Sequence, residues 1–124
     1  RIFNGRAAVL TGGRTHHELL LIEVGEATGP LSGKRIGIYH VGWKVGYDIQ
    51  NLRDARDRIL ESGYEIKGLS DHTISQSIYL DDPDGNEVEI YIDNRLFDWR
   101  HDHSWMESPV KPLDLSGDND ATVK

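Results

Sequence analysis

Cysteine is absent from the 124-residue chain, so a disulfide and a thiolate metal site are both excluded. No apolar run approaches the roughly 20 residues that cross a bilayer. The longest run, residues 19–22, has the length of a buried strand. No secretory signal is visible, and we expect a cytoplasmic protein, which the lack of cysteine fits. Histidines and carboxylates are therefore the side chains available to bind a transition metal.

Basic residues are outnumbered, with 14 lysines and arginines against 21 aspartates and glutamates, and the net charge is −7. An acidic surface argues against nucleic acid or an anionic membrane as the partner. The length suits one domain of ordinary size. A mean hydropathy of −0.54, together with thirteen glycines, indicates a modest core with many turns.

Two strands are predicted in the N-terminal part, at residues 6–11 and 17–24. The short glycine-containing loop between them indicates an antiparallel pair. The chain opens with Arg1 rather than Met. We therefore expect residues 1–30 to be the C-terminal strands of a first β-α-β-β-β module whose beginning lies upstream.

A complete β-α-β-β-β module is predicted over residues 36–93. Its helix is expected to begin after a cap at Asp48 and to end near Ser62, because apolar residues recur at helical spacing between them and Gly63 supplies a stop. The strands are expected at residues 36–45, 64–68, 75–81 and 86–92, with a polar loop holding Asp71 and His72 and a turn at 82–86.

The C-terminal stretch, residues 94–124, shows no clear period. We expect a tail that wraps the surface of the domain as far as Leu115. From Ser116 onward the polar composition predicts disorder.

His40 and Glu89 stand out because each is a metal-ligand type in a predicted strand whose apolar residues occupy the opposite face. If those apolar faces pack on the helix, His40 and Glu89 both point to the inner side of a curved sheet. A hydrogen-bonded structural histidine is the alternative interpretation of His40. Glu87 lies nearer the turn, and we expect it to meet solvent.

Residues 37–45 (GIYHVGWKV), Asp71-His72 and residues 79–91 (YLDDPDGNEVEIY) resemble the vicinal oxygen chelate superfamily of glyoxalases, bleomycin and fosfomycin resistance proteins and extradiol dioxygenases. The chain most resembles the catechol 2,3-dioxygenase branch. The features that favour this branch are residues 16–21 (HHELLL), the spacing from His72 to Tyr79, and the tail from Tyr91 to Leu115. The resemblance covers about residues 5–115. It implies an α+β fold in which β-α-β-β-β modules form curled mixed sheets, with a helix on the convex face.

The resemblance further implies a non-haem Fe(II) enzyme of aromatic catabolism, or a fragment of one, that cleaves a small catechol-like diol with O2. Mn(II) is the alternative metal. His40 and Glu89 would be metal ligands. The third ligand of the family is a histidine on the first strand of the first module, and no residue of this chain occupies that position. Two histidines and one carboxylate leave open positions for substrate and oxygen.

The same resemblance implies catalytic roles for His17, His72 and Tyr79. His17 would move protons between the diol and oxygen, although the strand register could exchange it with His16. His72 and Tyr79 would hydrogen-bond the substrate, and alternation places Tyr79 on the polar side of its strand. Solvated or purely structural roles are the alternatives for these residues.

Two other functions are consistent with the sequence. One is a glyoxalase-like metal lyase or isomerase, or a thiol transferase, in which His72 and Tyr79 have no special role. The other is a metal-free dimer of the bleomycin-resistance type that binds a small molecule in a groove lined by Trp43 and other aromatic residues. A single curled sheet would expose strand edges and its concave face, so we expect a homodimer or another homo-oligomer.

Overall fold

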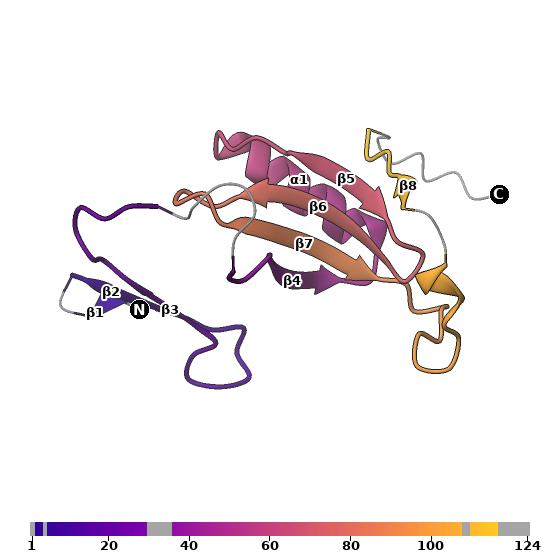
Figure 1. Cartoon of the computed structure of the whole chain (residues 1–124), viewed down its shortest axis with the longest axis horizontal. Helices are drawn as coiled ribbons and strands as arrows, with labels where there is room; N and C mark the ends of the chain where they lie inside the picture. Colours follow the sequence, from indigo (N-terminus) through magenta and orange to yellow (C-terminus); the bar gives the residue numbers. More distant parts are fainter. Residues whose placement is uncertain (1, 4, 30–35, 108–109, 117–124) are drawn as a thin grey trace.

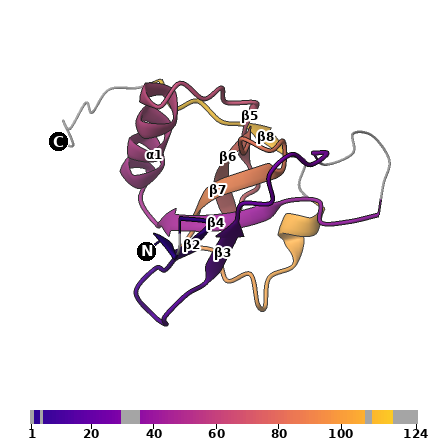
Figure 2. The same ribbon diagram turned by 90° about the vertical axis from the view of Figure 1, so that its left-hand side faces the viewer.

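The computed structural model describes residues 2–3, 5–29, 36–107 and 110–116, which form two β-sheets and an α-helix (Figure 1). The smaller sheet has three strands and comes from the N-terminal part of the chain. The larger has five strands and carries the helix on one face (Figure 2). This architecture confirms the predicted α+β class.

The smaller sheet is a meander of β1 (Ile2–Phe3), β2 (Ala7–Leu10) and β3 (Leu19–Ile22). Both strand pairs are antiparallel, which confirms the pairing predicted for the second and third strands. In the loop between β2 and β3, the Glu18 carboxylate accepts hydrogen bonds from the Gly12 amide and the Arg14 side chain. These hydrogen bonds, between exposed residues, hold the loop in shape.

The larger sheet contains the predicted β-α-β-β-β order. The elements are β4 (Val41–Gly46), α1 (Ile49–Glu61), β5 (Gly68–Asp71), β6 (Ser75–Asp81) and β7 (Glu87–Asp93). β4 runs parallel to β7, and α1 provides the crossover that a parallel pair requires. β7, β6 and β5 follow as antiparallel neighbours, so β4 and β7 are adjacent although they are the first and last strands of the module.

Two predicted strands are misplaced. The strand expected at 36–45 begins only at Val41, where pairing with Val88 of β7 starts. The strand expected at 64–68 lies at Gly68–Asp71, because its pairing with β6 begins at Gly68 and Tyr79. Asp71 therefore ends a strand, whereas we had expected it in a loop.

The tail adds a short 3-10 helix, η1 (Ser104–Met106), and an outer strand, β8 (Lys111–Pro112), which pairs with β5 (Figure 1). Leu115 is 1% exposed and belongs to the core, in agreement with a tail that wraps as far as this residue. The disorder predicted from Ser116 onward falls, except for Ser116 itself, on residues 117–124, which lie outside the described residues.

The core lies between α1 and the larger sheet. Leu52 of α1 packs with Ile78 of β6, Ile92 of β7 and Leu115 of the tail. Asp48 caps the start of the helix, because its side chain accepts a hydrogen bond from the Gln50 amide. The Asn51 side chain accepts in turn from the Asp48 amide, which completes a capping box. None of the helices in the described residues is long and apolar enough to cross a membrane.

Replacing Leu52 with alanine should lower the free energy of unfolding by about 2–5 kcal/mol, because the side chain is fully buried and its loss leaves a cavity. The matched control is Leu60→Ala on the same helix, where the leucine is 52% exposed and the cost should be within about 1 kcal/mol. Urea unfolding followed by circular dichroism measures both. Equal losses for the two variants would contradict this location of the core.

Candidate functional site

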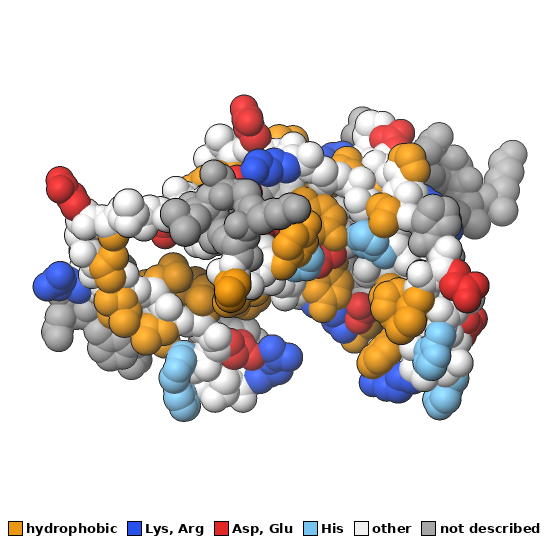
Figure 3. Space-filling model, in the orientation of Figure 1, with side chains coloured by type: hydrophobic (Ala, Val, Ile, Leu, Met, Phe, Trp, Pro, Cys, Tyr) orange, Lys and Arg blue, Asp and Glu red, His pale blue; other side chains and the backbone are white. Residues whose placement is uncertain are grey.

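The candidate site lies on the face of the larger sheet that points away from α1. Strand alternation puts Ser77 and Tyr79 of β6 on this face, opposite the core residue Ile78. On β7 the same alternation exposes Glu87 and Glu89 to it. In Figure 3, histidine and carboxylate atoms lie between hydrophobic side chains over the larger sheet.

His40 stands between two carboxylates. Its Nε2 atom is 3.1 Å from Oε2 of Glu89, and its Nδ1 atom is 3.1 Å from Oε2 of Glu87. The predicted convergence of His40 and Glu89 on one face is therefore present. Glu87 is about one-third exposed and so meets solvent in part, but it also contacts His40, which the sequence did not predict.

Glu89 is also held from the opposite side. Its Oε1 atom accepts hydrogen bonds from the Ser77 hydroxyl at 2.6 Å and from the Tyr79 hydroxyl at 2.9 Å. Because Oε1 takes both of these bonds, Oε2 is the oxygen turned toward His40. Ser77 is completely buried, which makes its bond to the carboxylate a fixed part of the sheet.

His72 joins the group through Tyr79. Its Nε2 atom is 2.8 Å from the Tyr79 hydroxyl. A phenol has a single hydrogen to donate, and Tyr79 donates it to Glu89. His72 must therefore donate from Nε2 to the phenol oxygen, so one chain of hydrogen bonds runs from His72 through Tyr79 to Glu89.

The environment of Tyr79 favours its neutral form. Burial, first, and the hydrogen bond to Glu89, second, raise the pKa of Tyr79 to about 12. The Tyr79 hydroxyl has one hydrogen, which it donates to Glu89, so it can donate to a bound oxygen atom only by giving up that hydrogen bond. The hydroxyl is thus a shared donor at the site.

Gly42 of β4 leaves space beside this cluster. It pairs with Glu89 in the ladder, and a Cβ atom at this position would lie 3.2 Å from the Tyr91 ring and 3.6 Å from the Glu89 carboxylate. A groove of about 350 Å³ adjoins the carboxylate at this point. Its lining comes from β4, β6, β7 and the tail and comprises Gly42, Ile74, Ser75, Glu89, Tyr91, Asp93 and Trp99.

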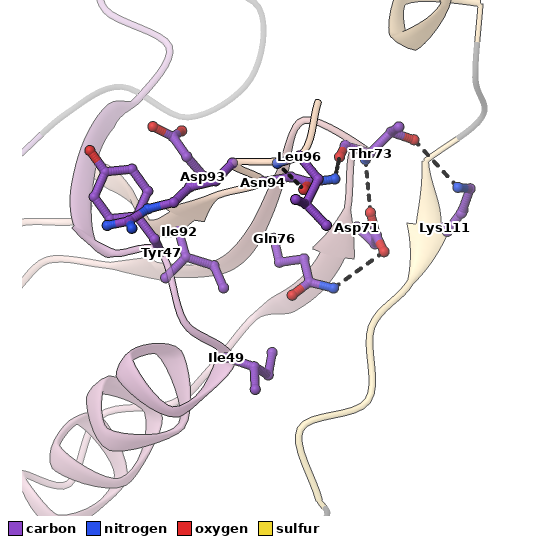
Figure 4. Close-up of a pocket in the computed structure, with 11 residues that line it drawn as sticks. Tyr47, Ile49, Asp71, Thr73, Gln76, Ile92, Asp93, Asn94, Leu96 and Lys111 are labelled. Carbon is purple, nitrogen blue, oxygen red and sulfur yellow. Dashed lines mark hydrogen bonds between the residues drawn. The ribbon is translucent and has the colours of Figure 1, made fainter. Parts of the chain in front are cut away.

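A second pocket shares Asp93 with this groove and extends around Tyr47, Ile92 and Lys111 (Figure 4). In it the Asp71 carboxylate accepts from the Thr73 amide and from the Gln76 side chain. None of the five predicted site residues lines this pocket. Glu89 itself lines the groove described above, so that groove adjoins the candidate site.

Four of the five predicted site residues come together, namely His40, Glu89, His72 and Tyr79. The fifth, His17, lies in the loop before β3, and in the described part of the chain its contact is with the exposed His16, 2.5 Å away. The strand position expected for His17 was wrong, because β3 begins at Leu19.

Sequence reasoning did not assign a site role to Ser77 or Glu87. Both could have been found from the alternation that selected Tyr79 and Glu89, because each lies two residues away on the same face of the same strand. Their bonding partners depend on how β6 pairs with β7 and how β7 pairs with β4. That information is not local.

The His40 and Glu89 atoms fit two neighbouring positions around a metal ion. Ligand atoms bound at about 2.1 Å and at right angles to each other lie about 3 Å apart, close to the observed 3.1 Å. Across the described residues, no group of three or more His, Cys, Asp and Glu side chains is arranged to hold a metal. The described residues thus offer two ligands to such an ion.

Comparison with known proteins places the chain in one superfamily, and both relatives named below are dioxygenases. The model of the Glyoxalase/Bleomycin resistance protein/Dioxygenase superfamily matches residues 3–90. A catechol-2,3-dioxygenase of Bacillus subtilis (strain 168) is 35% identical over 85 residues, which cover 68% of this chain and 29% of that protein. A biphenyl-2,3-diol 1,2-dioxygenase 2 of Rhodococcus globerulus is 33% identical over 88 residues, which cover 68% of this chain and 44% of that protein.

The matched region spans less than half the length of either curated relative. No solved structure gave a significant match. The superfamily match ends at Ile90 and therefore includes His40, Tyr79 and Glu89.

Tyr79 should ionise at higher pH than Tyr47, because burial raises the pKa of Tyr79 to about 12 whereas the hydrogen-bonded Lys44 ammonium lowers the pKa of Tyr47. The folded pKa of Tyr79 exceeds the unfolded value of about 10. Its contribution to stability is therefore complete below pH 10 and is lost as the pH rises toward 12. Carbon-13 NMR of the ring Cζ atoms follows each tyrosine.

The Glu89→Gln variant is the control for this titration, since it removes the charge that hydrogen-bonds the phenol. The midpoint of Tyr79 should fall in this variant while that of Tyr47 stays in place. A Tyr79 signal that moves together with Tyr47 in the unsubstituted chain would show that the hydrogen-bonded arrangement is absent in solution.

Proposed function

The chain belongs to the glyoxalase/bleomycin resistance protein/dioxygenase superfamily, and we propose that it is an extradiol dioxygenase that uses Fe(II) to cleave the ring of a catechol-like diol. The observation that carries the proposal is the continuous group of His40, Glu89, Tyr79 and His72. A glyoxalase-like reaction would give the His72–Tyr79 pair no task. The names of both matched relatives describe dioxygenases.

His40 Nε2 and Glu89 Oε2 would hold the metal. Fe(II) with two histidines and one carboxylate keeps open positions, and when bound it would bring a chelated diol and dioxygen together. Mn(II) has similar ligand preferences and is the alternative. The third ligand would be a histidine from outside the described residues or from a second polypeptide.

The other residues would prepare the site for a diol. Ser77 and Tyr79 occupy Oε1 of Glu89 and leave Oε2 for the metal. A diol seated in the groove beside Glu89 would bring an oxygen within reach of the Tyr79 hydroxyl. His72, which donates to Tyr79, could then replace the proton that the phenol gives away.

Gly42 keeps that approach open, because any larger side chain would crowd the Tyr91 ring and the Glu89 carboxylate. The part of the groove formed by Ile74 and Trp99 is apolar and suits an aromatic ring. The acid–base role of His17 stays a prediction.

The test is anaerobic loading of the purified chain with Fe(II), followed by catechol and air, with the yellow ring-fission product followed by absorbance. His40→Ala and Glu89→Ala should each lose the metal. His72→Phe and Tyr79→Phe should keep the metal and lower the rate by about 10²- to 10⁴-fold, because they remove proton donors.

His101→Phe is the matched control, since this histidine is exposed in the tail and, in the described part of the chain, its side chain is hydrogen-bonded to Asp98 and not to the candidate site. It should leave both metal content and rate unchanged. Retention of iron by the His40→Ala and Glu89→Ala variants would contradict the assigned ligands. Metal content without any ring-fission product would favour another reaction of the superfamily.

We further propose that the chain acts as a homodimer or larger homo-oligomer. Several large apolar side chains remain exposed on β3, including Leu20, Leu21 and Ile22, and Trp43 on β4 is 37% exposed. β4 is an outer strand of its sheet. Covering such surfaces is the usual way to protect strand edges from nonspecific pairing.

Gel filtration with light scattering should therefore give at least twice the chain mass of 14.0 kDa at micromolar concentration. A single monomeric species across that range would contradict the oligomer. The result is independent of the metal assay, because it requires no bound iron.

A further inference from the structure

Two carboxylates flank the His40 ring, and they cannot play the same part. Glu87 approaches Nδ1, and Glu89 approaches Nε2, each at 3.1 Å. The two nitrogens of an imidazole point to different sides of the ring, so a metal bound at Nε2 is out of reach of a carboxylate hydrogen-bonded at Nδ1. Glu87 is thereby separated from the ligand pair.

The contact of Glu87 has the geometry of a hydrogen bond, with Nδ1 as the atom involved. An ionised carboxylate only accepts hydrogen bonds, so Nδ1 must carry the proton. The Nε2 atom of His40 is equally close to Glu89, but that contact lacks hydrogen-bond geometry, so a neutral imidazole with its single N–H at Nδ1 leaves the Nε2 lone pair on the side of Glu89. That is the tautomer a metal ligand needs.

The backbone does little to orient His40. The ladder between β4 and β7 begins with Val41 and Val88, so His40 lies just outside the paired residues. Its side chain is about 29% exposed and lies near the rings of Tyr39 and Tyr79, 5.1 and 5.8 Å away between centroids, and these contacts do not determine which ring nitrogen carries the hydrogen. The hydrogen bond to Glu87 supplies the missing restraint.

We propose that Glu87 is a positioning residue that holds His40 in the Nδ1–H tautomer and aims its Nε2 lone pair at the place next to Glu89 where a metal would bind. The proposal deepens the metal-dependent function given above and rests on it. Carboxylates that orient a metal-binding histidine in this way typically change metal affinity 10- to 100-fold when they are removed.

The first experiment needs no metal. Long-range nitrogen–proton NMR of histidine-labelled chain, recorded at about pH 9, distinguishes a protonated from an unprotonated ring nitrogen, and His40→Gln identifies the His40 signals. The unsubstituted chain should show a protonated Nδ1 and a bare Nε2. In Glu87→Leu the proton should move to Nε2, where Glu89 can accept it.

Two variants separate orientation from charge. Glu87→Gln loses the charge but keeps an oxygen that accepts from Nδ1, so it should preserve the tautomer. Asp81→Asn is the matched control, because Asp81 lies directly across the ladder from Glu87 and pairs with Lys67 without touching His40. It removes the same charge and should leave the tautomer unchanged.

The second experiment titrates each form of the chain with Co²⁺ and follows its visible absorption. Glu87→Leu should bind about 10- to 100-fold more weakly than the unsubstituted chain, whereas Glu87→Gln and Asp81→Asn should stay close to it. Circular dichroism confirms that all variants are folded. Full affinity in Glu87→Leu would overturn the proposal.

The results also separate this inference from the proposed function. The predicted tautomers in a chain that binds no Co²⁺ would support the role of Glu87 and count against the metal-dependent function. Co²⁺ binding with a proton on Nε2, or on both nitrogens, in the metal-free unsubstituted chain would overturn the role of Glu87 and leave the function standing.

Discussion

The parallel pairing of β4 with β7 is the interaction on which the rest of the structure depends. It places Val41 beside Val88 and Gly42 beside Glu89, and so brings His40 next to a carboxylate that lies 49 positions further along the chain. A parallel pair needs a long crossover, and α1 supplies it. The burial of Leu52 against Ile78 and Ile92 thus fixes the helix and, through it, the separation of the two candidate ligands.

The two faces of the larger sheet carry different groups of side chains. One face meets α1 and carries the apolar core, whereas the other carries a chain of hydrogen bonds that runs from His72 through Tyr79 to Glu89. His72 donates to the Tyr79 oxygen, and the Tyr79 hydroxyl donates to Glu89. Buried polar groups linked in this way keep a fixed geometry, because breaking one bond leaves another group unsatisfied.

Membership of the superfamily accounts for the fold but does not select the reaction, since one fold can support several chemistries. The distinguishing features are the residues attached to the ligand pair. Tyr79 is a proton donor that itself accepts a hydrogen bond from His72, and the Ser77 hydroxyl donates to the Glu89 carboxylate. These side chains are the reason for proposing oxygen chemistry on a diol rather than a reaction that uses only the metal and its ligands.

The amino-acid sequence by itself determined the features that depend on near neighbours. The cap at Asp48 and the helical spacing predicted α1 to within one residue at each end, and alternation predicted both the bounds of β6 and the shared face of His40 and Glu89. Tertiary structure decided what depends on distant partners. The pairing register moved β5 to Gly68–Asp71, set Glu87 against His40, and left His17 in a loop, because strand pairing joins residues that no local pattern connects.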